Sequence, residues 1–380
     1  MDALRKYPAI EDLHRRARKR IPKFAFDYLE GGAGDESGID RNREALLEVR
    51  LIADYLEERT PPDLGVEVFG RKVDLPFGIA PVGLSGLIWP RSAEYLAAAA
   101  KDANAVFCLS TVASSGVERI GGLMQEGSWF QLYPIREVET EDDLLKRAWD
   151  AGFRVLTPTI DIPAAARRLR DFRNGLTVPP EMTIGSIISI LTHPTWALAT
   201  LAAGTPKFES LTPYFPKGVS YKSVGQMIET LAEGQIDWRR IERYRKIWPG
   251  ALAVKGVLSV GDARRAQEAG CDGLLVSNHG GRQLDGLVSP IDVLPAIRET
   301  VGPDMTLVVD SGLRSGTDIV RAYAKGADFT LLGRAFFYGV GALGRPGAAH
   351  AIEILKAEVF AALQQLGCPN MAAASRYLAK

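Results

Sequence analysis

The chain has 380 residues, of which 46% are hydrophobic and 24% are charged, and its formal net charge is +0. This is ordinary globular composition with enough length for a large core. Because the charge is balanced and no basic block or basic-aromatic pattern appears, the composition gives no support to a nucleic-acid partner.

Short apolar runs rich in β-branched residues recur along the chain, and helical patterns such as EYLAAAAKDA and TEDDLLKRAWDAG follow them. The runs are FGIAPV (77–82), AVFCLST (105–111), SWFQLY (128–133), RVLTPTID (154–161), ALAVKGV (251–257), GLLVSN (273–278), LVVDSG (307–312) and FTLLGR (329–334). Strands that are apolar throughout, rather than alternating, are buried on both faces, as in a parallel sheet. Roughly eight β-then-α units in series predict one (β/α)8 TIM barrel over residues 76–380.

Two segments lie outside this count. Residues 1–75 form an N-terminal extension, partly helical, which we expect to pack on the barrel mouth. Residues 175–235 are long for a connection after the fourth strand, which predicts a lid or insertion. Within them, residues 183–204 are largely apolar and contain no Asp, Glu, Lys or Arg.

Three features bear on location. The cysteines Cys108, Cys271 and Cys368 are odd in number and far apart, which fits a reducing compartment and offers no metal-ligand spacing, so no metal is expected. The N-terminus has no apolar signal region. His193, Pro194 and Trp196 interrupt residues 183–204, so this segment is better suited to docking at a membrane surface than to crossing it. We therefore predict a cytoplasmic protein, either soluble or peripheral on the inner face of the membrane, with packing of the segment as an ordinary lid as the alternative.

Polar or charged side chains follow nearly every predicted strand, at the barrel end where chemistry takes place in this fold. A barrel kept only for structure does not need so many polar groups at one mouth. These candidate site residues are Pro81, Val82, Gly83, Ser110, Gln131, Tyr133, Thr159, Asp161, Arg168, Lys255, Ser277, His279, Arg282, Asp310, Gly312, Arg314, Gly333 and Arg334.

The last two strand ends, DSGLRSG and LLGRAF, combine glycines with arginines. Glycine allows backbone N–H groups to approach a phosphate, and arginine binds one bidentately. Since the loops after strands seven and eight are the usual phosphate site of this fold, we expect a cofactor that carries a phosphate.

The stretch SNHGGRQLD (277–285) places His279 and Arg282 three residues apart with two glycines between them. A histidine near its ordinary pKa of about 6.5 is suited to accepting a proton. A guanidinium binds a carboxylate in a fixed orientation. The stretch therefore predicts a base and a carboxylate-binding cation directed at one ligand.

Together with VKGV, FQLY, TIDIP, DSGLRSGTD and LLGRAF, this stretch resembles the FMN-dependent 2-hydroxy acid dehydrogenases and oxidases. The resemblance runs from FAFDYLEGGAGDE to near the C-terminus. APVGLSG, CLSTV and LTHPTWA are most similar to the quinone-linked L-lactate and mandelate dehydrogenase branch. The resemblance implies a homotetrameric flavin barrel that uses FMN to oxidise an L-2-hydroxy acid and passes the electrons to quinone or another acceptor.

The resemblance also assigns roles position by position. His279 matches the base, Asp161 the carboxylate that holds it, and Arg282 and Arg168 the clamp on the substrate carboxylate. Tyr28 and Tyr133 match the tyrosines that hydrogen-bond the substrate. Lys255 matches the cation beside the flavin ring. The matched cofactor contacts are Pro81, Val82, Gly83, Ser110, Gln131, Thr159, Ser277, Asp310, Gly312, Arg314, Gly333 and Arg334.

Some positions depart from members of the family. Val112 stands where glycolate oxidase carries a tryptophan, and Ala165 is also small. Both leave space for substrates from lactate to an aryl hydroxy acid. Gly83 is glycine, as in dehydrogenases of the family, whereas its oxidases tend to carry alanine there.

Several alternatives stay open from the sequence alone. The enzyme could be an oxidase that uses O2, or a family member that acts on a modified peptide or an amine. Outside this class, Lys255 could form a Schiff base in a flavin-free aldolase or isomerase barrel. A binding module without catalysis is a third class.

Overall fold

Eight parallel strands close into a barrel in the order β10-β3-β4-β5-β6-β7-β8-β9, which confirms the predicted TIM barrel. The computed structural model describes residues 3–56, 60–176, 181–215 and 236–379. The strands are β3 (Phe77–Ile79), β4 (Val106–Ser110), β5 (Ser128–Leu132), β6 (Phe153–Pro158), β7 (Ala251–Val257), β8 (Gly273–Val276), β9 (Thr306–Val309) and β10 (Phe329–Leu332). Several strands stop before the apolar run ends, so the last residues of those runs leave the ladder and form the barrel mouth.

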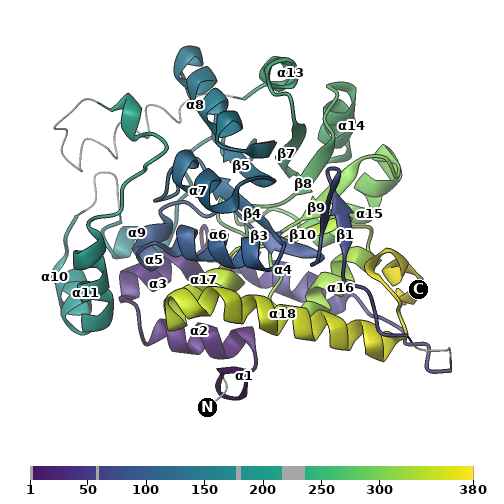
Figure 1. Ribbon diagram of the computed structural model, residues 1–380, viewed down its shortest axis with the longest axis horizontal. Coiled ribbons are helices and arrows are strands. Elements are labelled where there is room, and N and C mark those ends of the chain that lie inside the picture. Colours follow the sequence, from purple (N-terminus) through teal and green to yellow (C-terminus); the bar gives the residue numbers. More distant parts are fainter. Residues whose placement is uncertain (1–2, 57–59, 177–180, 216–235, 380) are drawn as a thin grey trace.

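Helices surround the barrel, and Figure 1 shows α17 and α18 running along one side of it. The helices of the barrel and the C-terminus are α5 (Ser85–Ile88), α6 (Ser92–Asp102), α7 (Val117–Met124), α8 (Val138–Asp150), α13 (Trp238–Ile247), α14 (Val260–Glu268), α15 (Pro290–Val301), α16 (Gly316–Ala324), α17 (Arg334–Leu343), α18 (Arg345–Leu366) and η2 (Met371–Tyr377). Several begin at a side-chain cap. Ser259, for example, accepts a hydrogen bond from the backbone N–H of Asp262, which satisfies one of the free donors at the start of α14.

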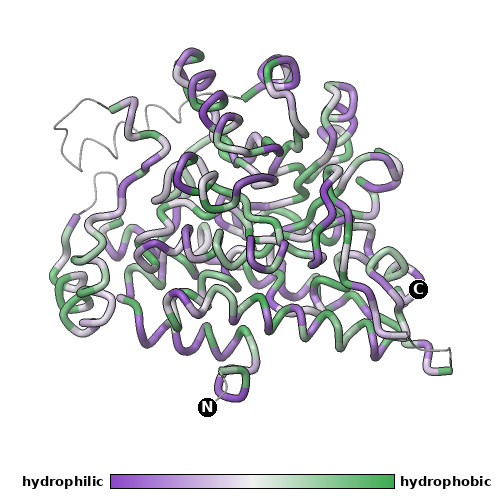
Figure 2. Tube along the Cα trace, in the orientation of Figure 1, coloured by the Kyte–Doolittle hydropathy of each residue, from purple (hydrophilic) through white to green (hydrophobic). Residues whose placement is uncertain are grey.

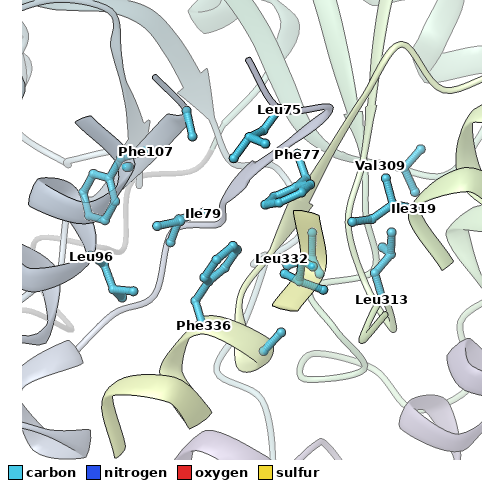
Figure 3. Close-up of a cluster of buried hydrophobic side chains, with 14 of the residues drawn as sticks. Leu75, Phe77, Ile79, Leu96, Phe107, Val309, Leu313, Ile319, Leu332 and Phe336 are labelled. Carbon is cyan, nitrogen blue, oxygen red and sulfur yellow. The ribbon is translucent and has the colours of Figure 1, made fainter. Parts of the chain in front are cut away.

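The apolar core has two layers. The outer layer lies between strands and helices, where Phe77 of β3 packs against Phe336 of α17 with ring centroids 6.2 Å apart (Figure 3). The inner layer fills the barrel, where Trp129 of β5 meets Phe329 of β10 at 5.7 Å. The filled interior leaves only the two ends of the barrel for other functions.

The N-terminal extension contains α1 (Ala3–Lys6), α2 (Ile10–Arg18), α3 (Lys23–Glu30), α4 (Ser37–Glu48) and the antiparallel pair β1 (Val66–Val68) and β2 (Arg71–Val73). α3 and α4 lie at the mouth, but the β1–β2 hairpin closes the opposite end. Phe69 at its turn packs 5.2 Å from Trp129 and faces Gly273 at the start of β8. The hairpin therefore lies away from the mouth, on which we expected residues 1–75 to pack. Its apolar turn covers the aromatic rings that would otherwise face solvent.

The long connection after β6 contains α9 (Leu169–Arg173), α10 (Ile184–Leu191), α11 (Pro194–Ala203) and η1 (Thr212–Tyr214). Residues 177–180 and 216–235 of the predicted lid lie outside the described residues. α10 and α11 meet at an angle of 97°, project at one edge of the molecule in Figure 1, and are coloured mainly as hydrophobic in Figure 2. Among the described helices, none is by itself long and apolar enough to cross a membrane, whereas this bent pair passes the same test as a unit.

One aromatic side chain attaches the helix pair to the body of the protein. Trp196 of α11 is buried, donates its indole N–H to the carbonyl of Leu87 (3.1 Å) and packs edge-on against Phe24 of α3 at 5.6 Å. The His193 ring hydrogen-bonds to the carbonyl of Ser189 (2.6 Å) at the bend between the two helices.

Candidate active site

A cavity of about 830 Å³ opens at the carboxyl ends of the strands, a size within the usual range for small-molecule and cofactor sites. Most of the residues predicted from the sequence lie on its wall. They are Tyr28, Pro81, Val82, Gly83, Gln131, Tyr133, Arg168, Lys255, His279, Arg282, Asp310, Gly312, Arg314, Gly333 and Arg334. The barrel thus gathers side chains from α3, from strand ends and from the connection after β6 around one space.

Three predicted cofactor contacts lie behind this wall. The Ser110 hydroxyl donates to Gln131 Oε1, and Gln131 Nε2 donates to Thr159 Oγ1, both at 2.8 Å. Ser277 Oγ accepts a hydrogen bond from Lys255 Nζ (3.0 Å). In this structure Ser110 and Thr159 fix the orientation of the Gln131 amide, and Ser277 holds the lysine, while Gln131 and Lys255 face the cavity.

A histidine and an aspartate from different strands form the centre of the site. His279 Nδ1 lies 3.0 Å from Asp161 Oδ1. Since an ionised carboxylate can only accept, Nδ1 carries the proton and Nε2 keeps its lone pair. The Tyr133 hydroxyl lies 3.2 Å from Nε2 and is placed to donate to it. The ring is therefore held with its basic nitrogen toward the cavity.

Electrostatics keep this histidine neutral. Burial lowers the pKa of His279, against the opposing effect of Asp161, and the charge of Lys255 lowers it further. The structure thus places the pKa below the ordinary value expected from the sequence. Burial alone would raise the pKa of Asp161, but His279 and Lys255 hold it below its usual value. The pair is a neutral base held by an ionised carboxylate, which is the arrangement that general-base chemistry requires.

Tyr133 keeps its proton as well. Burial raises the pKa of its hydroxyl to about 12. A phenol that stays protonated across the physiological range can donate a hydrogen bond to a ligand oxygen once a ligand takes its place beside His279.

Lys255 is a buried cation between two acids. Its Nζ lies 3.9 Å from Asp161 Oδ2 and 3.7 Å from Asp310 Oδ2. Burial would lower the pKa of this ammonium, but the two carboxylates raise it above its ordinary value. A lysine held in the charged form is a poor nucleophile, so the site does not favour the Schiff-base alternative.

Two arginines, Arg168 and Arg282, line one end of the cavity. Arg282 Nη1 donates to the carbonyls of Tyr28 and Gly31 (2.8 and 2.7 Å), and Arg168 Nε donates to the carbonyl of Arg282 (3.3 Å). Burial, together with the charge of Arg168, lowers the pKa of Arg282 to about 9. Two guanidinium groups held close together, one of them buried, indicate a place for an anion.

The neighbouring arginine at position 167 is exposed and lies beside the Phe172 ring, with its guanidinium carbon 5.9 Å from the ring centroid. Arg168, by contrast, lines the cavity. Of these two adjacent arginines, Arg168 therefore faces the cavity, whereas Arg167 lies on the surface.

The opposite end of the cavity carries Gly312, Arg314, Gly333 and Arg334. Burial lowers the pKa of Arg334 to about 10, and the nearby Arg314 adds to the shift. Arg334 already donates to the carbonyls of Leu29, Gly31 and Gly280 at 2.9–3.0 Å. It therefore also ties α3 to the His279 loop, and its five N–H donors leave capacity for a phosphate.

The backbone of the His279 loop is unusual. His279, Gly280 and Gly281 all have positive φ, at 59°, 70° and 74°. A Cβ added at Gly281 would come within 2.9 Å of the backbone nitrogen of Ile39 in α4, so both the conformation and the close approach require glycine. Three left-handed residues in a row let His279 and Arg282 face one space.

Sequence reasoning missed part of the wall. The connection after β6 adds Asp171, Phe172 and Leu176, and the loop after β8 adds Gln283. Ser311 also lines the cavity, and its hydroxyl accepts from the N–H of Gly280 (3.0 Å) and donates to Asp310 (2.7 Å). The adjacent arginines at positions 167 and 168 precede Asp171 in the sequence and were a signal for that part of the cavity wall. No local sequence pattern indicated a role for Ser311.

The barrel mouth combines glycines and arginines suited to a phosphate with a neutral histidine held by an ionised aspartate. This combination is typical of an enzyme that joins a phosphate-bearing cofactor to acid–base chemistry. The comparison with known proteins agrees, because the FMN-dependent dehydrogenase family matches residues 17–380. The chain belongs to the FMN-dependent dehydrogenase family, and it is therefore an FMN-dependent oxidoreductase.

Relatives and solved structures match over nearly the whole chain. An L-lactate dehydrogenase of Xanthobacter autotrophicus is 36% identical over 366 residues, which are 96% of this chain and 94% of the relative. An L-lactate dehydrogenase of Vibrio cholerae is 34% identical over 97% of each chain. The crystal structure of the monotopic membrane protein (S)-mandelate dehydrogenase is 34% identical with a TM-score of 0.93 and 98% coverage of both chains.

The residues of the cavity fit FMN. One end offers two arginines and Gly333, where an added Cβ would have no atom closer than 3.6 Å, so the backbone there is open to a phosphate. In the middle of the cavity, Gln131 and the charged Lys255 are suited to hydrogen-bond the polar edge of the flavin ring. An apolar wall that includes Ala80 and Leu331 is suited to contact the face of the ring. Bound FMN supplies a sink for two electrons.

Proposed function

We propose that this enzyme oxidises an L-2-hydroxy acid to the 2-oxo acid and passes the electrons to an acceptor other than oxygen. The observation that carries the proposal is the combination, in one cavity, of a neutral base at His279 and an arginine pair at Arg168 and Arg282. A 2-hydroxy acid has both features that this combination recognises, a carboxylate and an adjacent CH–OH group. Oxidation of that group to a ketone releases two electrons and two protons; His279 accepts one proton, and bound FMN would take up the electrons with the other.

The residues of the chain divide the work. Arg282 and Arg168 hold the carboxylate and orient the Cα–H bond. Tyr133 donates a hydrogen bond to a substrate oxygen. Nε2 of His279 accepts the proton, and the charge of Asp161, 3.0 Å from Nδ1, stabilises the imidazolium that results. Lys255 provides a buried positive charge beside the cavity, which would stabilise negative charge on the flavin ring of bound FMN.

The substrate end accommodates more than a methyl group. Val112, Ala165, Phe172 and Leu176 line the cavity there, and apolar walls of this kind favour an apolar substituent on C2. The substrate class is therefore an L-2-hydroxy acid with an apolar substituent, from lactate to aryl acids.

The absorption spectrum of the purified protein tests this function. Flavin bands that bleach without oxygen on addition of (S)-mandelate or L-lactate are expected, and the corresponding D-acids serve as matched controls. A spectrum that no 2-hydroxy acid bleaches contradicts the proposal. Equal rates of peroxide formation and dye-linked turnover would make the enzyme an oxidase instead.

We further propose that the α10–α11 pair docks on the membrane surface, where a quinone acceptor resides. Ile184 and Leu191 of α10 are 78% and 74% exposed, and Leu198 and Leu201 of α11 are 67% and 81% exposed. A patch of this kind, with no charge in its sequence, is suited to the acyl boundary of a bilayer. The monotopic (S)-mandelate dehydrogenase with a similar structure supports this proposal.

Basic residues lie next to this patch. A smaller cavity of about 220 Å³ at the bend is lined by Arg16, Lys19, Arg20, Thr192, His193, Pro194 and Thr195. The Arg20 guanidinium stacks on the Trp89 ring, 3.7 Å from its centroid, and donates to the carbonyl of Gly341. Cations beside an exposed apolar patch complement anionic lipid headgroups.

Flotation with liposomes tests the docking. The intact chain is expected to float with phosphatidylglycerol-containing vesicles, whereas a chain with a Gly/Ser linker in place of residues 183–204 stays at the bottom. Leu201→Ser is expected to weaken flotation, while Val138→Ser, which removes a half-exposed apolar side chain of α8, leaves it unchanged. Equal behaviour of the intact and linker chains would make the segment a lid.

We also propose that the enzyme is a homotetramer, and sedimentation of the purified protein tests this.

A further inference from the structure

Two buried asparagines face each other across the N-terminal extension and the barrel. Asn42 Nδ2 donates to Asn278 Oδ1 (2.9 Å), and Asn278 Nδ2 donates to Asn42 Oδ1 (2.7 Å). They are 1% and 2% exposed. A reciprocal amide pair in a buried place is strong and directional, because breaking it leaves a donor and an acceptor unpaired away from water.

Asn278 immediately precedes His279, and its side chain also bonds to the turn that contains His279. Asn278 Oδ1 also accepts from the N–H of Gly281 (3.1 Å), and its Nδ2 also donates to the carbonyl of Val288 (3.1 Å). The side chain therefore spans the turn that contains His279. Since His279 has a φ of 59°, a conformation that costs free energy for a residue with a Cβ, surrounding bonds must hold it there.

Helix α4, which carries Asn42, is itself fixed to the same loop. Asp285 accepts from the N–H of Gly38 (2.6 Å) and from the N–H of Asp35 (3.2 Å). Arg41 donates to the carbonyls of Asp285 and Leu287 (2.8 and 3.0 Å). The start of α4 is thus seated on the loop that follows His279.

Arg43, which follows Asn42 in α4, reaches the end of the cavity that carries Gly312. Arg43 Nη1 donates to the carbonyl of Gly312 (2.5 Å) and to Asp318 (2.7 Å). Gly312 has a φ of 91°, and a Cβ there would lie 2.8 Å from the carbonyl oxygen of Asn42. One turn of α4 therefore touches both the loop of the base and the loop of the phosphate site.

We propose that Asn42 is a positioning residue for His279, which acts through Asn278 and touches neither substrate nor cofactor. The proposal rests on the proposed function, in which His279 is the base. It assigns to the N-terminal extension a part in proton transfer, besides the Tyr28 side chain that the extension places in the cavity.

The test compares Asn42→Ala with Glu44→Ala, an exposed position on the same helix, in the flavin-loaded enzyme. Displacement of a catalytic group by about 1 Å can cost on the order of 100-fold. We expect Asn42→Ala to retain its flavin spectrum and to lose roughly 10- to 100-fold in the rate of flavin reduction by (S)-mandelate. The affinity for oxalate, read from the perturbation of the flavin spectrum, should change far less, because Arg282 is held separately by Tyr28 and Gly31.

A second readout separates positioning from general stability. The rate of flavin reduction falls at low pH as His279 becomes protonated, and this fall is the acid limb of the pH profile. If Asn42→Ala loosens and hydrates the His279 ring, the acid limb moves up toward pH 6.5, the ordinary pKa of histidine. In a double-mutant cycle, Asn42→Ala and Asn278→Ala should together cost no more than the larger single effect, since both break one pair.

Asn42→Asp keeps the size of the side chain, so it serves if Asn42→Ala fails to fold. It loses the donor to Asn278 Oδ1 and is expected to slow reduction in the same direction. A normal reduction rate and an unmoved acid limb in a folded, flavin-loaded variant overturn the proposal, as does loss of folding in both variants. If His279→Gln also reduces its flavin normally, the proposed function fails; if only His279→Gln is slow, the inference about Asn42 alone fails.

Discussion

The imidazole Nδ1 of His279 lies 3.0 Å from Oδ1 of Asp161, although 118 residues separate the two in the chain. The barrel brings the ends of β6 and β8 together, and the contact fixes which ring nitrogen carries the proton. Burial keeps the imidazole neutral at rest, and the carboxylate stabilises its charged form once a proton arrives. The same contact thus serves the resting enzyme and the step that it catalyses.

His279→Gln should keep the flavin and almost abolish its reduction by substrate. The glutamine amide can still hydrogen-bond Asp161, but it cannot accept a proton near neutral pH, and loss of a general base costs roughly 10²–10⁴-fold. Anaerobic stopped-flow reduction measures the effect. His193→Gln, at the bend between α10 and α11, is the matched control. A near-normal rate in His279→Gln would remove this residue from the base role.

The reduction rate should fall only at a pH below the ordinary histidine value of 6.5, because burial lowers the pKa of His279 and the base works in its neutral form. Asp161 opposes that shift, so Asp161→Asn should move the acid limb to still lower pH. It should also slow reduction by roughly 10²–10⁴-fold, because the imidazolium loses its partner. If the acid limb of the pH profile moves to higher pH in Asp161→Asn, Asp161 does not raise the pKa of His279 as the structure indicates.

Arg282→Lys should lower kcat/KM by roughly 10- to 100-fold. This loss corresponds to about 1.5–3 kcal/mol, the contribution of one hydrogen bond to a charged group. Lysine keeps the charge, but it cannot bind a carboxylate bidentately while it also holds the carbonyls of Tyr28 and Gly31. Steady-state kinetics with L-lactate or (S)-mandelate give the value. Arg167→Lys, in the exposed neighbour of Arg168, should behave like the unmodified enzyme, and equal kinetics in both variants would exclude a carboxylate clamp at Arg282.

Gly83→Ala should change the reactivity of the reduced enzyme with oxygen. An added Cβ would lie 2.8 Å from Cγ2 of Val112 and 3.7 Å from the hydroxyl of Tyr28, so the wall beside the cofactor site must shift. The unmodified protein is expected to form peroxide much more slowly than it reduces a dye, and the variant to alter that ratio. Peroxide formation by the unmodified protein at the rate of dye reduction would reverse the expectation.

The barrel and most of the cavity wall could be predicted from the sequence, because their signals are local. Each continuously apolar run contains a strand, and the polar residues that end the runs meet at one mouth because parallel strands all point the same way. SNHGGRQLD carries its own backbone requirement, since Gly280 and Gly281 permit the positive φ that directs His279 and Arg282 to one ligand.

Only the tertiary structure decided which distant residues support that mouth. Asn42 and Asn278 are 236 residues apart, and neither belongs to a pattern that marks it as a partner of the other. The hairpin at Phe69 packs on the end of the barrel opposite to the one expected, because the uncovered rings of the interior lie there. Local periodicity reports which face of a segment is buried, but not what covers it. That choice depends on the shape and the unpaired hydrogen-bonding groups of the folded barrel.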